Sequence, residues 1–292
     1  MTAEPQARLL VTSHDDLGES PVWDRTGNCL RWTDITGRAV RSWDSETDTV
    51  ESIDVDQEIG FLVPCADGGW LAGARDGLAR LRESQLHFTH RVDSRDGTHR
   101  LNDGKADPLG RVWFGTMAFD AQAGEGALHR LSLDGTITTV LDGLNIPNGL
   151  GWSADATTMY FVESTEQRID RFDIDIDTGN IVGRDVLVDL SQVDGVPDGL
   201  CVDGEDHVWV AMWGGSHVRR IRPDGSLDLV VTVPASQPTS ICIGGRSGRQ
   251  AFVTTAAYQL PAATALAEGA GHIYTFEAPA PGVPAHRAAV GC

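Results

Sequence analysis

The chain has 292 residues, enough for one large domain or two modest ones and for a sizeable core. Its 42 acidic and 23 basic residues give a net charge of −19, which argues against nucleic acid or an anionic membrane as a partner. A hydrophobic content of 41% excludes disorder as the main state, and no apolar run approaches the length of a membrane span. The polar N-terminus also lacks a signal-peptide pattern.

The cysteines are scattered, odd in number and without a CxxC motif. This usage favours a reducing cytoplasm over a disulfide framework or a zinc–thiolate site, so we expect a cytoplasmic protein. The five positions are Cys29, Cys65, Cys201, Cys242 and Cys292.

A short strand pattern recurs six times along the chain. Apolar leading strands are expected at 21–23, 62–64, 104–106, 149–152, 199–202 and 241–243. Second strands follow at 29–32, 70–73, 112–115, 159–162, 208–211 and 251–254. Third strands follow at 39–43, 78–81, 127–131, 169–172, 218–221 and 273–276. Fourth strands are expected at 50–53, 86–92, 137–141, 186–190 and 227–233.

The leading strands end at turn residues spaced 40 to 50 residues apart, namely Asp24, Asp67, Asp107, Ser153, Asp203 and Gly244. A repeated four-strand unit of this length indicates an all-β, six-bladed β-propeller with antiparallel blades, covering 1–292 as one domain. The sixth unit lacks a fourth strand, which residues 8–12 can supply by pairing the N-terminal segment with the last blade. An open sandwich of short strands is the alternative, but a sandwich does not require the sixfold period.

The first strand of each propeller blade lines the axis, and five residues before each turn lies a candidate inward position. These positions are Glu19, Leu62, Asn102, Asn148, Asp198 and Thr239. Four of the six carry carboxylate or carboxamide oxygens, which suit one divalent cation: Ca²⁺, Mg²⁺, Mn²⁺ or, less exclusively, Zn²⁺. A solvated polar channel is the alternative. A glycine follows within two residues of Asn102, Asn148 and Asp198, as close backbone approach or a turn would require.

Several loops are expected on the same face as this ring: 93–100, 117–125, 163–167, 213–216 and 258–270. Long loops often carry specificity, and 266–268 belongs to an Ala-rich stretch that predicts one short helix, a candidate lid. Most tryptophans are interpreted as packing between blades, whereas Trp213 lies on a site-facing loop. His87 and His90 are interpreted as surface residues of an outer strand.

The chain resembles the regucalcin/gluconolactonase family of six-bladed propellers. The matching stretches are 17–23, 100–105, 147–150, 197–203 and 271–274. The resemblance implies a divalent-metal-dependent hydrolase, most often of sugar lactones.

By this resemblance the metal ligands are Glu19, Asn148 and Asp198. Arg100 and Asn102 match substrate-holding residues, and Asp120 is the nearest match to a further substrate-contacting acid, in a loop of different length. The position of Lys105, the only lysine, suggests a structural role.

The leading hypothesis is therefore hydrolysis of an aldono-lactone, a small-molecule substrate, to the aldonic acid. The metal would polarise the lactone carbonyl, and Asp198 would also act as general base. The alternatives are a non-catalytic calcium-binding or scaffold propeller and a metal-dependent aryl-ester or organophosphate hydrolase. The sequence does not indicate the oligomeric state.

Overall fold

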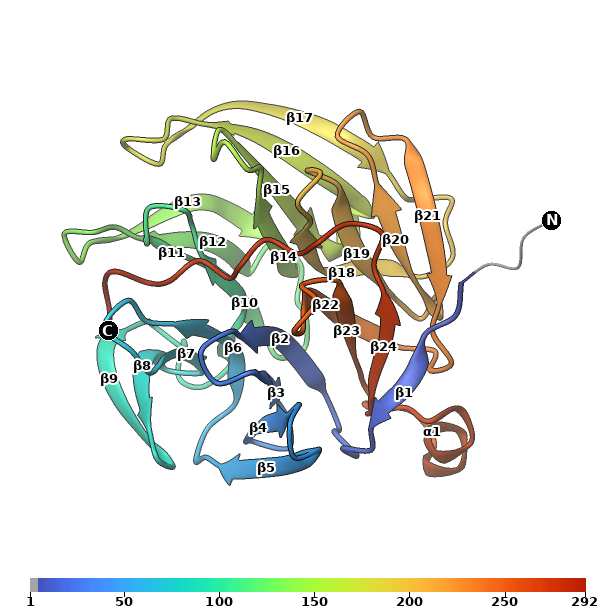
Figure 1. Cartoon of the computed structure of the whole chain (residues 1–292). Helices are drawn as coiled ribbons and strands as arrows, with labels where there is room; N and C mark the ends of the chain where they lie inside the picture. The colour runs from blue at the N-terminus through green and yellow to red at the C-terminus, as the bar shows by residue number, and fades with distance from the viewer. Residues whose placement is uncertain (1–4) are drawn as a thin grey trace.

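The computed structural model describes residues 5–292, in which 24 strands form six four-stranded antiparallel sheets around an axis (Figure 1). The predicted six-bladed propeller is confirmed. Neither of its two short helices, η1 (Ser164–Glu166) and α1 (Ala262–Glu268), has the length and apolar character needed to cross a bilayer.

Each blade runs from an innermost strand to an outermost one. The innermost strands are β2 (Gly18–Asp24), β6 (Ile59–Pro64), β10 (His99–Ala106), β14 (Pro147–Trp152), β18 (Val196–Val202) and β22 (Pro238–Gly244). The second strands are β3 (Cys29–Asp34), β7 (Trp70–Ala74), β11 (Val112–Ala118), β15 (Thr158–Glu163), β19 (Val208–Trp213) and β23 (Gln250–Thr255).

The two outer strands of each blade complete the sheets. The third strands are β4 (Ala39–Asp44), β8 (Gly77–Arg82), β12 (Gly126–Leu131), β16 (Arg168–Ile174), β20 (His217–Ile221) and β24 (Ile273–Glu277). The outermost are β5 (Thr49–Asp54), β9 (Gln85–Arg91), β13 (Ile137–Leu144), β17 (Ile181–Asp189), β21 (Leu227–Thr232) and β1 (Arg8–Val11).

The N-terminal strand closes the ring, as predicted. β1 pairs antiparallel with β24, placing Arg8 opposite Thr275 and Leu9 opposite Tyr274. The last blade therefore contains both early and late segments of the chain, and its sheet cannot form until both are present.

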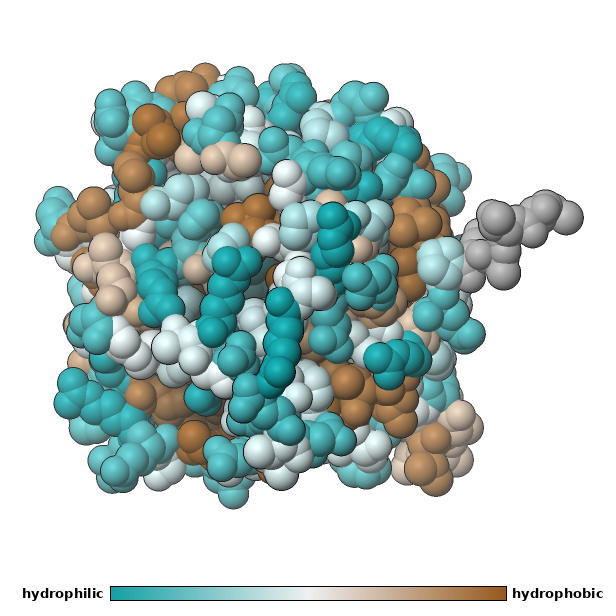
Figure 2. Space-filling model, in the orientation of Figure 1, coloured by the Kyte–Doolittle hydropathy of each residue, from teal (hydrophilic) through white to brown (hydrophobic). Residues whose placement is uncertain are grey.

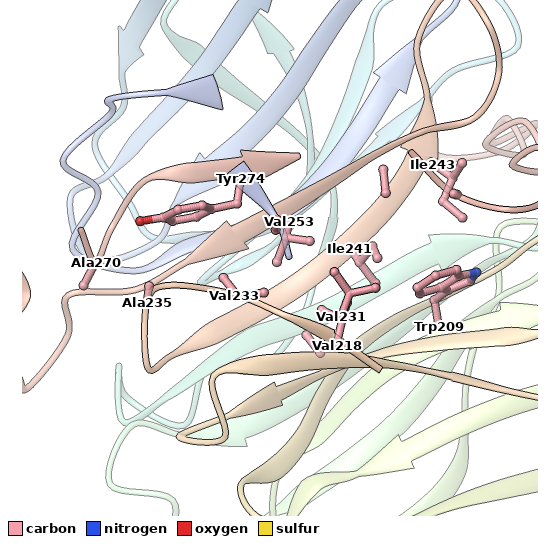
Figure 3. Close-up of a cluster of buried hydrophobic side chains, with 14 residues drawn as sticks. Trp209, Val218, Val231, Val233, Ala235, Ile241, Ile243, Val253, Ala270 and Tyr274 are labelled. Atoms are coloured by element: carbon pink, nitrogen blue, oxygen red, sulfur yellow. The ribbon is translucent and has the colours of Figure 1, made fainter. Parts of the chain in front are cut away.

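Burial falls from the axis outward, because each inner strand packs between two neighbouring blades. β14 is buried throughout, whereas β5 is exposed at every position but one. The cluster between blades five and six shows this packing, with Trp209, Val218 and Val231 facing Ile241 and Tyr274 (Figure 3). His87 and His90 lie in the outer strand β9, where His87 is exposed.

Tryptophans join neighbouring blades, as predicted from their positions in the blade strands. The six assigned to this role are all buried: Trp23, Trp32, Trp43, Trp113, Trp152 and Trp209. The Trp23 ring stacks on Phe252 of the sixth blade with centroids 5.4 Å apart, which adds specific geometry to apolar burial.

Buried aspartates at the turns after inner strands satisfy the indole N–H groups. Trp113 Nε1 donates to Asp107 at 3.0 Å, and Trp209 Nε1 donates to Asp203 at 2.9 Å. Asp203 also accepts from Arg220 Nε at 2.8 Å. These acids thus do more than shape a turn, because they pair groups that would otherwise be buried without partners.

The cysteine pattern favoured reduced thiols, and the structure corrects this for two of them. Cys65 and Cys292 form a disulfide across 227 positions of sequence, a pairing that spacing does not reveal. It fixes the last segment, residues 278–292, which crosses the ring from β24 to the second blade and which we call the strap (Figure 1). Cys29, Cys201 and Cys242 remain free.

We expect Asp203→Ala to lower the free energy of unfolding by about 3 kcal/mol or more, because it leaves the buried Trp209 and Arg220 donors short of an acceptor. Denaturant titration measures this loss. Asp224→Ala, in an exposed turn of the same blade where the carboxylate accepts from Ser226 N, is the matched control and should change little. Equal losses in both variants would contradict the assigned role of Asp203.

Candidate functional site

The pairing register shifts near the start of every inner strand, at the same end of the axis. The extra residues are 20–21, 60, 102–103, 148–149, 198–199 and 239. Such bulges turn a side chain away from the ordinary alternation of a strand. Here they direct side chains from several blades towards the axis and create one polar cluster.

The glycines within these bulges allow the inner strands to approach one another. A Cβ on Gly149 would lie 2.6 Å from Asp198 O, and one on Gly199 would lie 2.1 Å from Ser240 Oγ. Neither glycine has a positive φ. Close backbone approach, one of the two explanations open from the sequence, therefore accounts for both.

Glu19 reaches the cluster from one residue before its bulge. Ser20 takes a left-handed φ of 49° there, and its backbone N–H donates to Glu19 Oε2 at 2.9 Å. Burial, with a further contribution from the charge of Asp103, raises the pKa of Glu19 to about 8. The strained backbone and the local hydrogen bond hold this carboxyl group in a position that is costly for a charge.

Asn148 and Asp198 occupy equivalent bulges in neighbouring blades. Asn148 Nδ2 donates to Ser164 Oγ at 3.1 Å, and Asn148 is also within hydrogen-bonding reach of Asp198. Asp198 Oδ1 is buried without a hydrogen-bond partner in the described chain. Burial and then the charge of Glu19 raise the pKa of Asp198 well above its usual range.

Asp103 is a third buried acid of the cluster, to which sequence reasoning assigned no role. Its Oδ1 accepts from Gly104 N at 2.7 Å, whereas its Oδ2 lacks a partner among residues 5–292. Burial raises the pKa of Asp103. Its position could have drawn attention to it, because Asp103 is the second residue of its bulge and the equivalent residues of the next two blades are Gly149 and Gly199.

Arg100 and Asn102 lie beside these acids. Arg100 Nη1 donates to Asn102 Oδ1 at 2.7 Å, and Asn102 Nδ2 donates to Pro147 O at 2.9 Å. Burial lowers the pKa of Arg100, and the charges of Glu19 and Asp198 act in the opposite direction. Arg100 has no carboxylate within 4 Å in residues 5–292, so it is not a rim arginine held by an ion pair.

The structure revises two of the six candidate axial positions. In the second blade the bulge falls at Gly60, and Leu62 instead packs with Val40 and Ala72. Thr239, another predicted inward position, lies at a bulge but donates to Gly18 O at 2.5 Å, so its hydroxyl serves the fold.

Asp120 lies outside the buried cluster. It is exposed in the turn after β11, where its carboxylate accepts from Gln122 N at 3.2 Å. The charges of Asp120 and Arg95 both act on the pKa of His99, so the two residues belong to the same rim. Arg95 also binds Glu125. The predicted helix in the 258–270 loop is confirmed as α1, whose Leu266 side chain is 80% exposed.

The donor set fits a divalent cation. Glu19, Asp103 and Asp198 are buried together, and Arg100 and Lys105 supply positive charge to them. Uncompensated buried carboxylates are costly, and two of these oxygens are without partners in the described chain. Carboxylate and amide oxygens are preferred ligands of hard cations, so Glu19, Asn148 and Asp198 have the right chemistry to hold one.

We expect the metal-free protein to lose stability as pH rises from about 4.5 to about 8. Across this range folded Glu19, with its pKa near 8, keeps a proton that the unfolded residue, with a pKa near 4.5, releases. Glu19→Gln should flatten the slope, whereas Glu51→Gln on exposed β5 should not. Denaturant titrations in chelator at several pH values test this, and an unchanged slope in Glu19→Gln would contradict it.

Comparisons with known proteins agree with this geometry. The model of the family described as "SMP-30/Gluconolactonase/LRE-like region" matches residues 17–257. Regucalcin of Xenopus laevis is 36% identical over 255 residues, covering 85% of each chain.

Two solved structures have the same fold over nearly the whole chain. The calcium-binding protein regucalcin of Agrobacterium tumefaciens superposes with a TM-score of 0.90 at 26% identity, covering 98% of each chain. A luciferin-regenerating enzyme also gives 0.90, at 27% identity, covering 98% of this chain and all of the other. With the family model and these relatives in agreement, the chain belongs to the SMP-30/gluconolactonase/LRE-like family.

Proposed function

We propose that this protein is a divalent-metal-dependent hydrolase that opens a sugar lactone to the corresponding aldonic acid. The observation that carries the proposal is the buried acid cluster, in which Asp198 Oδ1 lacks a partner among residues 5–292 beside a guanidinium that has no ion pair. The family's description, which includes gluconolactonase, supports the reaction class.

The cation would be held by Glu19, Asn148 and Asp198. When bound, it supplies Lewis-acid polarisation of the acyl oxygen and compensates the negative charge of the buried carboxylates. Ser164 orients Asn148 by accepting from Nδ2, which leaves the amide oxygen as the ligand atom. The backbone N–H of Ser20 orients Glu19 by donating to its Oε2.

Asp198 is the proposed general base. Its hydrogen-bond-free Oδ1 accepts a proton from the water that attacks the acyl carbon. The ring C–O bond then breaks, and protonated Asp198 returns this proton to the ring oxygen, which leaves as the hydroxyl group of the open acid.

Arg100 and Asn102 are the proposed substrate-holding pair, and Asp120 is a further contact from the exposed rim. Arg100 uses Nη1 on Asn102 and on Leu101 O, which leaves its other donors for hydroxyl oxygens of the substrate. Asn102 accepts from Arg100 and donates to Pro147 O, so it orients the guanidinium, and its second N–H and second acceptor site remain for the substrate.

A panel of lactones assayed with a pH indicator tests the proposed function. Chelated protein should be inactive, and one or more of Ca²⁺, Mg²⁺, Mn²⁺ and Zn²⁺ should restore turnover of a hydroxyl-rich lactone. Metal binding without turnover of any lactone would instead support the calcium-binding scaffold. Preferential turnover of aryl esters or organophosphates would reassign the substrate.

We expect Asp198→Asn to lower kcat by about 10²- to 10⁴-fold at saturating metal, because it removes the base and one negative ligand. Circular dichroism should remain that of the parent protein. Asp194→Asn, the same change in an exposed link on the same face, is the matched control and should keep full activity. An active Asp198→Asn enzyme would assign the base to another group.

We expect Arg100→Ala to lower kcat/KM by about ten- to a hundredfold, mainly through a higher KM, because charge-assisted hydrogen bonds to hydroxyl groups are lost. Steady-state kinetics on a hydroxyl-rich lactone and on one without hydroxyl groups separate binding from chemistry. Arg95→Ala, on the exposed rim, should have little effect on either. Equal losses by Arg100→Ala on both substrates would show that Arg100 does not recognise hydroxyl groups.

A further inference from the structure

A cavity lies at the opposite end of the axis from the acid cluster. Its volume is about 110 Å³, and all six inner strands contribute to its wall. Most of the lining is apolar, with Leu62, Leu150, Val202, Ile243, Trp23 and Trp152 among the contributors. An apolar cavity of this size is suited to a hydrocarbon group of a few carbons.

The strap covers this end of the axis (Figure 1). On one side Gly282 N donates to Gly248 O, and on the other Ala288 N donates to Pro64 O, close to the Cys65–Cys292 disulfide. Between these anchors, residues 283–286 line the cavity and make no backbone hydrogen bond to the blades in the described chain. The cavity thus has one wall that can be displaced without breaking a sheet.

The charge of the cavity is opposite to that of the protein. Although the chain has a net charge of −19, no aspartate or glutamate of residues 5–292 lines this space, whereas Lys105 and Arg25 both do. The other ionisable groups of the lining are His286 of the strap and the thiols of Cys201 and Cys242. Burial lowers the pKa of His286. The face on this side is largely hydrophilic around the strap (Figure 2), so an anion has a polar approach to the mouth.

Lys105 supplies the inner cationic group. It extends from β10 and donates to Leu150 O at 2.9 Å and to Leu200 O, so it ties blade three to blades four and five. An ammonium group has three N–H donors, which leaves one beyond these two carbonyls. No carboxylate lies within 4 Å of it in residues 5–292. Arg25 is exposed at the turn after β2 and likewise has no ion pair there.

We propose that this cavity is a second small-molecule site that binds a short-chain monocarboxylate, with the carboxylate on Lys105 and the hydrocarbon chain among the apolar residues. Arg25 at the mouth attracts the anion on entry. The site is separate from the acid cluster and does not depend on the proposed hydrolase activity.

Calorimetric titration of the chelated protein with acetate, propanoate, butanoate and pentanoate tests the proposal. Affinity should rise about fourfold for each added methylene while space remains, since each buried CH₂ contributes about 0.8 kcal/mol. Pentanoate should bind at least tenfold more tightly than pentanamide, its neutral isostere. Equal affinities, or no binding of pentanoate, would overturn the proposal.

Variants locate the site. Lys105→Gln keeps amide donors for the two carbonyls and should weaken pentanoate binding at least tenfold, with pentanamide unaffected. Should that variant not fold, Arg25→Gln, at an exposed position, should weaken pentanoate binding a few-fold and reduce its salt dependence. Arg8→Gln, an exposed arginine on β1 away from the cavity, is the control and should change neither ligand.

Arg100→Ala distinguishes the two ends of the axis. Binding in the far cavity should survive this substitution unchanged, whereas binding beside the acid cluster would be lost with it. Loss of pentanoate binding in Arg100→Ala, with retention in Lys105→Gln and Arg25→Gln, would assign the anion to the other end and overturn the proposal.

Discussion

The convergence of six strands on one axis is the constraint on which the rest of this structure depends. At the polar end the strands are so close that a single added carbon on Gly149 or Gly199 would meet the neighbouring strand. A regular ladder would direct side chains only into the spaces between blades, and a bulge in each inner strand changes that direction. The same crowding buries the carboxylates of Glu19, Asp103 and Asp198, and burial makes them costly to ionise.

Much of this arrangement could be predicted from sequence because strand length links each bulge to the following turn. Counting five residues back from Asp107 and Asp203 found Asn102 and Asp198, since these turns begin directly after the strand. The count failed in the second blade because the turn there begins at Cys65, whose N–H donates to Gly69 O. Asp67 lies inside that turn, so the count gave Leu62 instead of Gly60.

Other features depend on contacts that the spacing of residues in the sequence does not predict. Asp103 occupies a bulge position at which two other blades have glycine. Only the structure shows that its Oδ2 is buried without a hydrogen-bond partner in the described chain. The Cys65–Cys292 pair joins the second blade to the last residue described, and neither cysteine belongs to a motif. Ring closure by β1 was predictable because the sixth repeat lacked a strand, whereas the strap has no repeat to complete.

Lys105 explains why the axis has two different ends. Its ammonium group donates to carbonyls of two other blades, so it lies between the acid cluster and the far cavity. On one side it offsets the charge of Asp103 and Glu19, and on the other it presents positive charge to a cavity that no acid of residues 5–292 lines. A neutral residue there would remove one of the positive charges that act on the acids. The single lysine of the chain therefore both ties three blades together and gives the two ends of the axis opposite character, which extends the structural role its position suggested.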